Sequence, residues 1–246
     1  SIGNTLISMY VRCGALKKAQ EVFDGLVIWN VTSLNILLAG YSKTGQGEEA
    51  LSLFHRMGQE GICGNEITYM CILKACSNLG LFHCVRVCTH IITKKLDTSP
   101  SIGNTLIGMF SNCGDLMMAS EVFHKMAVHD AVTWNAKIGV YAEHGYYELA
   151  NCFFERMIYE ENLKPDHITF VNMLAACSHS GLLEKGQIYF ESMNSKYGLV
   201  PTLEHHTCMV GLFGRAGHFN GAEIVINGIP FSRDIAVWHT VLSACK

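Results

Sequence analysis

The chain has 246 residues, of which 49% are hydrophobic and 16% are charged. This composition excludes a disordered chain, because it supplies enough apolar surface to offset the entropy cost of folding. The net charge is −3, from 18 Lys and Arg against 21 Asp and Glu. The chain therefore lacks the basic footprint of a general nucleic-acid binder, which does not exclude a selective one. No apolar stretch approaches the ~18 residues of a membrane span.

The eleven cysteines show no paired CxxC spacing, and several follow Ala inside apolar runs, as Cys76 and Cys177 do. We expect reduced thiols that act as small core residues. Because the sequence begins without Met or an Arg- and Ser-rich leader, we expect a segment of a longer protein, with any targeting segment upstream.

The chain contains a repeat within a repeat. SIGNTLISMY at 1–10 returns as SIGNTLIGMF at 101–110, and ITYMCILKACSNLGL at 67–81 returns as ITFVNMLAACSHSGL at 168–182. Within each large unit, smaller units share one pattern: an apolar helical stretch runs to a Gly, and a second amphipathic stretch follows. Seven glycines lie where such a turn needs a positive φ: Gly14, Gly45, Gly80, Gly114, Gly145, Gly181 and Gly217. The pattern predicts an all-α protein, a right-handed solenoid of stacked helix–turn–helix repeats with a concave surface.

A polar residue recurs early in the first helical stretch of most units, just ahead of an apolar run. These residues are Asn4, Asn35, Asn104, Asn135 and Thr207. Asn is unfavourable inside a helix, so a single one would be interpreted as an N-terminal cap. Their recurrence at equivalent positions favours a functional face instead.

Several stretches resemble the pentatricopeptide repeats of plant organellar proteins with alternating P, L and S motifs. They are NTLIGMFSNCGD, VTWNAKIGVYAEHG, ITFVNMLAACSHSGLLEKG and CMVGLFGRAGHFNGAE, while IAVWHTVLSACK resembles the opening of the E1 extension of RNA-editing factors. The Trp, Leu-Gly and Tyr pattern of tetratricopeptide repeats is absent from the first helices. The resemblance divides the chain into motifs S 1–30, P 31–65, L 66–99, S 100–130, P 131–166, L2 167–202 and S2 203–234, followed by a truncated E1 motif at 235–246.

The resemblance implies that each repeat reads about one base of single-stranded RNA through its fifth and last residues. Asp accepts a hydrogen bond from the ring N–H of uracil or guanine, whereas Asn serves the unprotonated ring nitrogen of cytosine. The implied pairs are Asn4 with Asn30 and Asn35 with Asn65 for C or U, Asn104 with Asp130 and Asn135 with Asp166 for U, and Thr207 with Asp234 for G. Weak readout is implied for Met70 with Ser99 and for Val171 with Thr202. The implied target is Y-Y-N-U-U-N-G, 5′ to 3′ from the N-terminal repeat.

In this family the second residue of a repeat supplies an apolar flank for the base. Ile67, Val132 and Ile168 fit this role. The second residues of the remaining repeats are polar: Ser1, Thr32, Ser101 and Glu204.

Other chemistry is not supported by the sequence. The H-x-E and P-C-x-x-C elements of zinc deaminases are missing. Cys84 and Cys88, with His83 and His90 nearby, have helical spacing that favours core packing over metal binding. GLLEKGQ at 181–187 has phosphate-loop spacing, but Gln187 replaces the required Lys. We expect no catalytic residue, no metal and no cofactor in this segment, so any deaminase activity comes from an absent domain or a partner.

The leading hypothesis is a sequence-specific single-stranded RNA-binding solenoid that acts as a specificity factor for C-to-U editing in mitochondria or plastids. Its partners would be the RNA and a deaminase-bearing protein or editing cofactor, and no membrane. The alternative is a protein-interaction solenoid, similar to a tetratricopeptide scaffold, that binds a peptide in its groove. A third hypothesis is a truncated piece with little affinity of its own.

Overall fold

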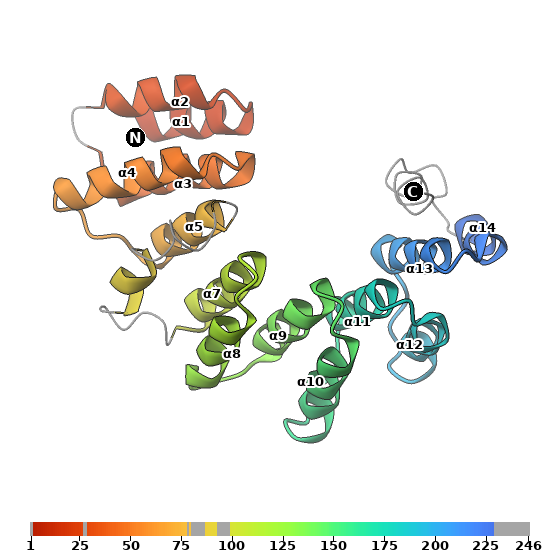
Figure 1. The fold of residues 1–246 in the computed structure, drawn as a ribbon. Helices are drawn as coiled ribbons and strands as arrows, with labels where there is room; N and C mark the ends of the chain where they lie inside the picture. Colours follow the sequence, from red (N-terminus) through yellow and green to blue (C-terminus); the bar gives the residue numbers. More distant parts are fainter. Residues whose placement is uncertain (1, 27–28, 78, 80–86, 93–98, 229–246) are drawn as a thin grey trace. The chain divides into compact units, whose positions relative to one another are not determined.

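The computed structural model describes residues 2–26, 29–77, 79, 87–92 and 99–228, and is drawn in Figure 1. Every regular element in these ranges is a helix, which confirms the predicted all-α class. The chain divides into two compact units, Ser1–Val128 and His129–Lys246. None of the helices in the described ranges has both the length and the hydropathy needed to cross a bilayer.

The first unit is built from successive helices that alternate between two layers. They are α1 (Ile2–Arg12), α2 (Leu16–Asp24), α3 (Val31–Thr44), α4 (Gly47–Gln59), α5 (Glu66–Cys76), α7 (Pro100–Asn112) and α8 (Leu116–Lys125), and residues 87–92 are also helical. The first helices α1, α3, α5 and α7 pack side by side in chain order. The second helices cover them, with α2 packed on α1 and α3, and α4 packed on α3 and α5.

The second unit repeats this arrangement. Its helices are α9 (Ala131–Glu143), α10 (Tyr147–Tyr159), α11 (His167–His179), α12 (Leu183–Ser195), α13 (Leu203–Arg215) and α14 (Phe219–Gly228). The first helices α9, α11 and α13 form one layer. The second helices form the other layer, because α10 packs on α9 and α11 while α12 packs on α11 and α13. Each unit thus has a layer of first helices and a layer of second helices (Figure 1).

The turns between paired helices contain the left-handed glycines that the sequence predicts. Their φ angles lie between 68° and 77° at Gly14, Gly45, Gly114, Gly145, Gly181 and Gly217. Gly80, the remaining member of the predicted set, lies outside the described residues. A side chain at these positions would be strained, so the turns depend on glycine.

The core consists of apolar side chains from both layers. Phe23, Phe123 and Phe154 of the second helices are buried, whereas Phe54 and Phe190 are half-buried. The cysteines of the described ranges are free thiols. Burial raises the pKa of the Cys177 thiol to about 12, so this side chain acts as a small apolar residue.

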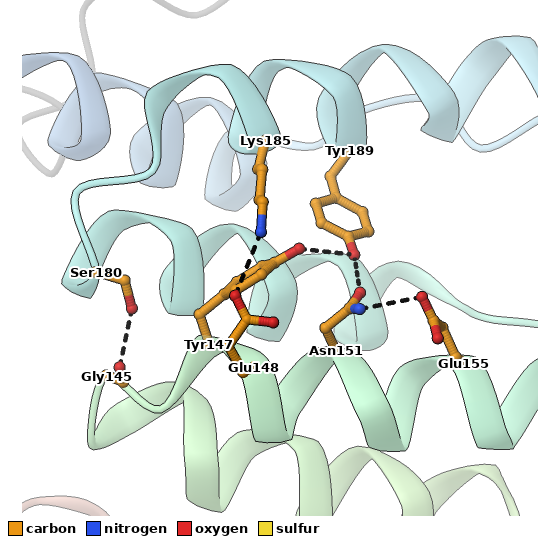
Figure 2. Close-up of polar contacts among 8 residues, drawn as sticks. All are labelled: Gly145, Tyr147, Glu148, Asn151, Glu155, Ser180, Lys185 and Tyr189. Atoms are coloured by element: carbon orange, nitrogen blue, oxygen red, sulfur yellow. Dashed lines mark hydrogen bonds and ion pairs between the residues drawn. The ribbon is translucent and has the colours of Figure 1, made fainter.

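Polar contacts between second helices add to this packing, and Figure 2 shows those between α10 and α12. The Tyr189 hydroxyl donates to Asn151 Oδ1 over 2.5 Å and lies 3.5 Å from the Tyr147 hydroxyl. Lys185 Nζ lies 3.4 Å from Glu148 Oε1 and 4.2 Å from the centre of the Tyr147 ring. All of these side chains belong to second helices.

Candidate nucleic-acid interface

The described last residues of the expected repeats lie at the N-terminal ends of first helices, and four of them cap the helix with a side chain. A side-chain oxygen accepts a hydrogen bond of 2.8–3.1 Å from the backbone N–H three residues later at Asn30, Asn65, Asp130 and Asp166. The capping role considered for the fifth-residue asparagines therefore belongs to other residues, because Asn35 and Asn135 lie inside α3 and α9. Capping satisfies backbone donors that the helix itself leaves unpaired.

A hydrogen bond joins Asn135 of α9 to Asp166, the N-cap residue of α11. Asn135 Nδ2 donates to Asp166 Oδ1 over 2.9 Å, and Thr169 Oγ1 donates to Asn135 Oδ1 over 2.7 Å. Asn172 Nδ2 also donates to the backbone oxygen of Asn135 over 2.8 Å. Asn135 is 5% exposed, and these bonds offset the cost of holding a buried amide inside a helix.

Asp166 is held as a carboxylate. Partial burial acts to raise its pKa, but the hydrogen bonds from Thr169 and Asn135 outweigh burial and lower the pKa below its usual value. The bonds from Thr169 N and Asn135 Nδ2 both end on Oδ1, and Thr169 Oγ1 lies 2.9 Å from the same atom. The second carboxylate oxygen of Asp166, Oδ2, is a further hydrogen-bond acceptor that none of these contacts involves.

Asn35 and Asn65 form an equivalent pair in the first unit. Asn35 Nδ2 donates to Asn65 Oδ1 over 3.0 Å, and Thr68 Oγ1 donates to Asn35 Oδ1 over 2.7 Å. In Asn65 the side-chain oxygen accepts the capping hydrogen bond, as Oδ1 does in Asp166. The remaining polar atom is therefore the amide nitrogen in Asn65 and Oδ2 in Asp166. The two sites therefore differ in one group, a donor in one and an acceptor in the other.

The sequence alone does not single out Thr68 and Thr169. Their signal is the spacing of a capping box, Asn or Asp followed three residues later by Thr. That spacing predicts a cap, but it does not predict the bond to the preceding helix.

The expected flanking residues are unusually exposed for large apolar side chains. Ile67 is 56% exposed, Val132 60% and Ile168 59%. Each lies two residues after a cap, so that Val132 and Ile168 occupy the same register position on the adjacent helices α9 and α11. Thr32, Ser101 and Glu204 are exposed at the corresponding positions of other first helices, and Ser1 lies outside the described residues.

The structure does not assemble every expected pair. In the described part of the first unit, no hydrogen bond joins Asn4 to Asn30, and the Ser33 hydroxyl donates to the Asn30 carbonyl over 2.8 Å. Asn104 belongs to the first unit and Asp130 to the second, so no contact between them is described.

The pair expected to read G is incomplete as well. The Thr207 hydroxyl donates to the Leu203 carbonyl of its own helix over 2.8 Å. Asp234 and the expected E1 motif lie outside the described residues.

The two pairs of expected weak readout have half-buried apolar first members, Met70 and Val171. Ser99 Oγ donates to Glu66 Oε1 over 2.5 Å. Thr202 contacts His205, whose Nδ1 lies 2.7 Å from the Thr202 hydroxyl and whose Nε2 lies 2.9 Å from the His167 carbonyl. Burial lowers the pKa of His205, so a neutral imidazole stands where Thr169 stands one repeat earlier.

Among the described residues, no group of three or more His, Cys, Asp or Glu side chains is arranged to hold a metal. Cys88 is buried, and His90 Nε2 lies 3.0 Å from the Tyr69 hydroxyl. His83 and Cys84 lie outside the described residues.

Comparison with known proteins matches both the sequence and the fold. The profile of the PPR repeat matches residues 4–31, 104–130, 132–161 and 168–197, and that of the PPR repeat family matches residues 29–78. A putative pentatricopeptide repeat-containing protein of Arabidopsis thaliana is 38% identical, with 100% of this chain and 33% of the relative covered. A mitochondrial one is 36% identical, with coverages of 99% and 39%, and a chloroplastic one is 38% identical, with coverages of 100% and 33%. The chain spans about a third of the length of these relatives.

Among solved structures, the pentatricopeptide repeat protein PPR10 from maize matches with a TM-score of 0.70 at 22% identity, over 98% of this chain and 36% of that chain. PPR10 in complex with an 18-nt psaJ RNA element matches with a TM-score of 0.70 at 21% identity, over 98% of this chain and 37% of that chain. At these identities the match shows the fold, an α-solenoid of helix–turn–helix repeats. The sequence profiles cover more than half of the chain, which therefore belongs to the pentatricopeptide repeat family.

Proposed function

We propose that this chain binds single-stranded RNA in a sequence-specific manner, with about one base read by each helix pair. The observation that carries the proposal is the Asn135–Asp166 pair beside the exposed Ile168, an arrangement that recurs with Asn35, Asn65 and Ile67. An exposed apolar side chain next to a satisfied polar pair suits a ligand that has both an apolar face and a polar edge, as a nucleobase does.

The chemistry of the two pairs distinguishes pyrimidines. An Asn amide nitrogen carries two N–H groups, and one of those on Asn135 is used by Asp166. The other is suited to O2, which both uracil and cytosine present. Asp166, held as a carboxylate, accepts from the N3–H of uracil, whereas the amide nitrogen of Asn65 donates to the unprotonated N3 of cytosine.

We extend the proposal to three further pairs, for which the structure describes no hydrogen bond between the two members. Asn4 with Asn30, Asn104 with Asp130 and Thr207 with Asp234 complete the target Y-Y-N-U-U-N-G. Met70 with Ser99 and Val171 with Thr202 occupy the two unspecified positions. The apolar first members of these pairs have no polar group to offer a base edge, which is consistent with weak readout.

We further propose that the chain is a specificity factor for C-to-U editing of organellar transcripts. Relatives named as mitochondrial and chloroplastic support the organellar location, and the complex of PPR10 with RNA supports RNA as the ligand. The editing role depends on the resemblance of residues 235–246 to an E1 extension. Deamination would come from another domain or from a deaminase-bearing partner.

The test is a binding titration of the 246-residue chain with fluorescent RNA. We expect an RNA that contains Y-Y-N-U-U-N-G to bind at least tenfold tighter than a scrambled RNA of the same composition, because each base contact is worth about 1–3 kcal/mol. Equal affinity for both RNAs would contradict base reading. Absence of RNA binding together with capture of a peptide ligand would favour the scaffold function instead.

A further inference from the structure

Thr68 and Thr169 make one hydrogen bond more than a helix cap requires. Both are fully buried, and in both the backbone N–H and the hydroxyl engage the cap residue in front of them. In both, the hydroxyl also lies 2.7 Å from the Oδ1 of an asparagine on the preceding first helix, Asn35 or Asn135. This is the shortest contact that either hydroxyl makes, because the distances to the cap Oδ1 are 3.0 Å and 2.9 Å.

This extra bond fixes which way the asparagine amide points. In the observed orientation, Asn135 Oδ1 accepts from Thr169 while Nδ2 donates to Asp166. If the amide were turned over, its oxygen would face the Asp166 carboxylate, two acceptors without a proton between them. The Thr169 hydroxyl would then face Nδ2, which can only donate, and would lose the 2.7 Å bond in which it donates its proton to Asn135.

The capping box and the bond to the preceding helix are separable. Ser33 forms a complete capping box with Asn30, but its hydroxyl donates to the Asn30 carbonyl over 2.8 Å, not to Asn4. Capping alone therefore does not account for the bonds from Thr68 and Thr169 to the preceding asparagines.

In the sequence, a hydroxyl residue at the third position of a repeat occurs together with Asn at the fifth position of the preceding repeat. Each repeat whose fifth residue is Asn is followed by a repeat whose third residue carries a hydroxyl, namely Ser33, Thr68, Thr133 and Thr169. The two repeats with an apolar fifth residue, Met70 or Val171, are followed by Ile102 and His205 at that position. A residue needed only for capping would not be expected to follow the chemistry of the preceding repeat.

We infer that Thr68 and Thr169 are positioning residues for base readout by the preceding repeat. Each holds the fifth-residue amide with its N–H groups toward the last residue and the base, so that one nucleotide is read by three side chains from two repeats. This inference rests on the proposed function. It assigns part of the specificity at nucleotide 2 to Thr68 and at nucleotide 5 to Thr169.

The test compares Thr68→Val and Thr169→Val, which keep the side-chain shape and remove the hydroxyl. For each variant of the 246-residue chain, affinity is measured for the target RNA and for RNAs with A at nucleotide 2 or at nucleotide 5. We expect Thr169→Val to reduce the preference for U over A at nucleotide 5 about tenfold and to leave nucleotide 2 unchanged. Thr68→Val should do the reverse, and Thr68→Ser and Thr169→Ser should restore the preferences.

A cap-loss control separates positioning from general damage. Asp115 caps the second helix α8 by accepting from the Met118 N–H over 3.0 Å, so Asp115→Ala lowers stability without touching a reading pair. A loss of preference that is equal at both nucleotides, or that Asp115→Ala reproduces, would overturn the positioning role. So would unchanged preferences in both Val variants. A wild-type chain that does not discriminate target from scrambled RNA would overturn the proposed function, and the positioning role with it.

Discussion

At the scale of the residue, the two polar side-chain atoms of the last residue of a repeat have different roles. One oxygen of Asp166 or Asn65 caps the next helix and meets the fifth-residue asparagine. Under the proposed function, the other atom, an oxygen in Asp and a nitrogen in Asn, chooses the base. Because Asn and Asp cap helices about equally well, exchanging them changes the chemistry of the outer atom and little else.

This division of tasks predicts a reciprocal exchange of specificity. Asp166→Asn should move the preference at nucleotide 5 from U to C, and Asn65→Asp should move nucleotide 2 toward U. Each exchange should alter the ratio of affinities by about tenfold, since an outward acceptor becomes a donor or the reverse. The measurement is competition binding with RNAs that differ only at the nucleotide concerned.

Asp115→Asn is the matched control, because it makes the same exchange at the cap of α8, a second helix. It should leave both ratios unchanged. Unaltered ratios in Asp166→Asn and Asn65→Asp, with thermal stability retained, would contradict the assignment of base choice to the last residue.

The sequence predicts more of the fold than of the site. Apolar periodicity and the turn glycines predict the helix pairs, because both depend on local chain geometry. The bond between Thr169 and Asn135 joins residues 34 positions apart in sequence, so it depends on how their two helices pack together. Apolar periodicity predicts the helices but not this contact between them. The pairing of Asn4 with Asn30 likewise follows from the motif, yet no hydrogen bond joins them in the described structure.

At the scale of the element, α9 carries a buried lysine two residues beyond Asn135. Lys137 is fully buried, with Nζ 4.8 Å from the centre of the Tyr141 ring and 5.2 Å from that of Phe153. Burial lowers its pKa from 10.5 to about 8. The aromatic faces attract the charged ammonium, whereas burial disfavours its charged form.

The lowered pKa predicts that Lys137 destabilises the fold less in alkali than at neutral pH. Between about pH 8 and pH 10.5 the unfolded chain holds a proton on Lys137 that the folded chain releases, so the contribution of Lys137 to the free energy of unfolding rises with pH in this window. The contribution of this lysine amounts to about 3 kcal/mol. Urea unfolding of the wild type and of Lys137→Met, at several pH values from neutral to alkaline, measures the difference between them. Curves that stay parallel across the window would refute the prediction.

The second helices should contribute stability without contributing to base choice. The Tyr189 hydroxyl links α12 to α10 through Asn151 and Tyr147 (Figure 2). Tyr189→Phe removes this link, so we expect a loss of about 1 kcal/mol in the free energy of unfolding and unchanged ratios of affinity between RNAs. Calorimetry and competition binding check the two parts. Tyr159→Phe on α10 is the control, because Tyr159 is 74% exposed, and it should change neither quantity.

At the scale of the whole molecule, the proposed base readout depends on contacts that are local to two successive repeats. The reading pairs built around Asn35 and Asn135 lie in different units and have the same geometry. By contrast, the nearly identical first helices at 2–12 and 102–112 precede different last residues, Asn30 and Asp130. Similar helices are therefore expected to read different bases, which is what a modular repeat protein requires.

The overall charge predicts how salt affects binding. With 18 Lys and Arg against 21 Asp and Glu, the chain has few cations to spare for phosphates, and each phosphate neutralised on a single strand adds only about 0.7 to the slope of log affinity against log salt. We expect a slope of magnitude below about 3, which corresponds to a loss of less than ~60-fold between about 50 and 200 mM salt.

Target and scrambled RNA carry the same phosphates, so the ratio of their affinities should not change across the salt range. Titrations of both RNAs at four salt concentrations measure the slope and the ratio together. A slope steeper than about 5 would mean that phosphate contacts dominate the affinity. A ratio that falls as salt rises would mean that the discrimination itself is electrostatic. Only a ratio that falls with salt would remove hydrogen bonding by the Asn135–Asp166 and Asn35–Asn65 pairs as the source of specificity.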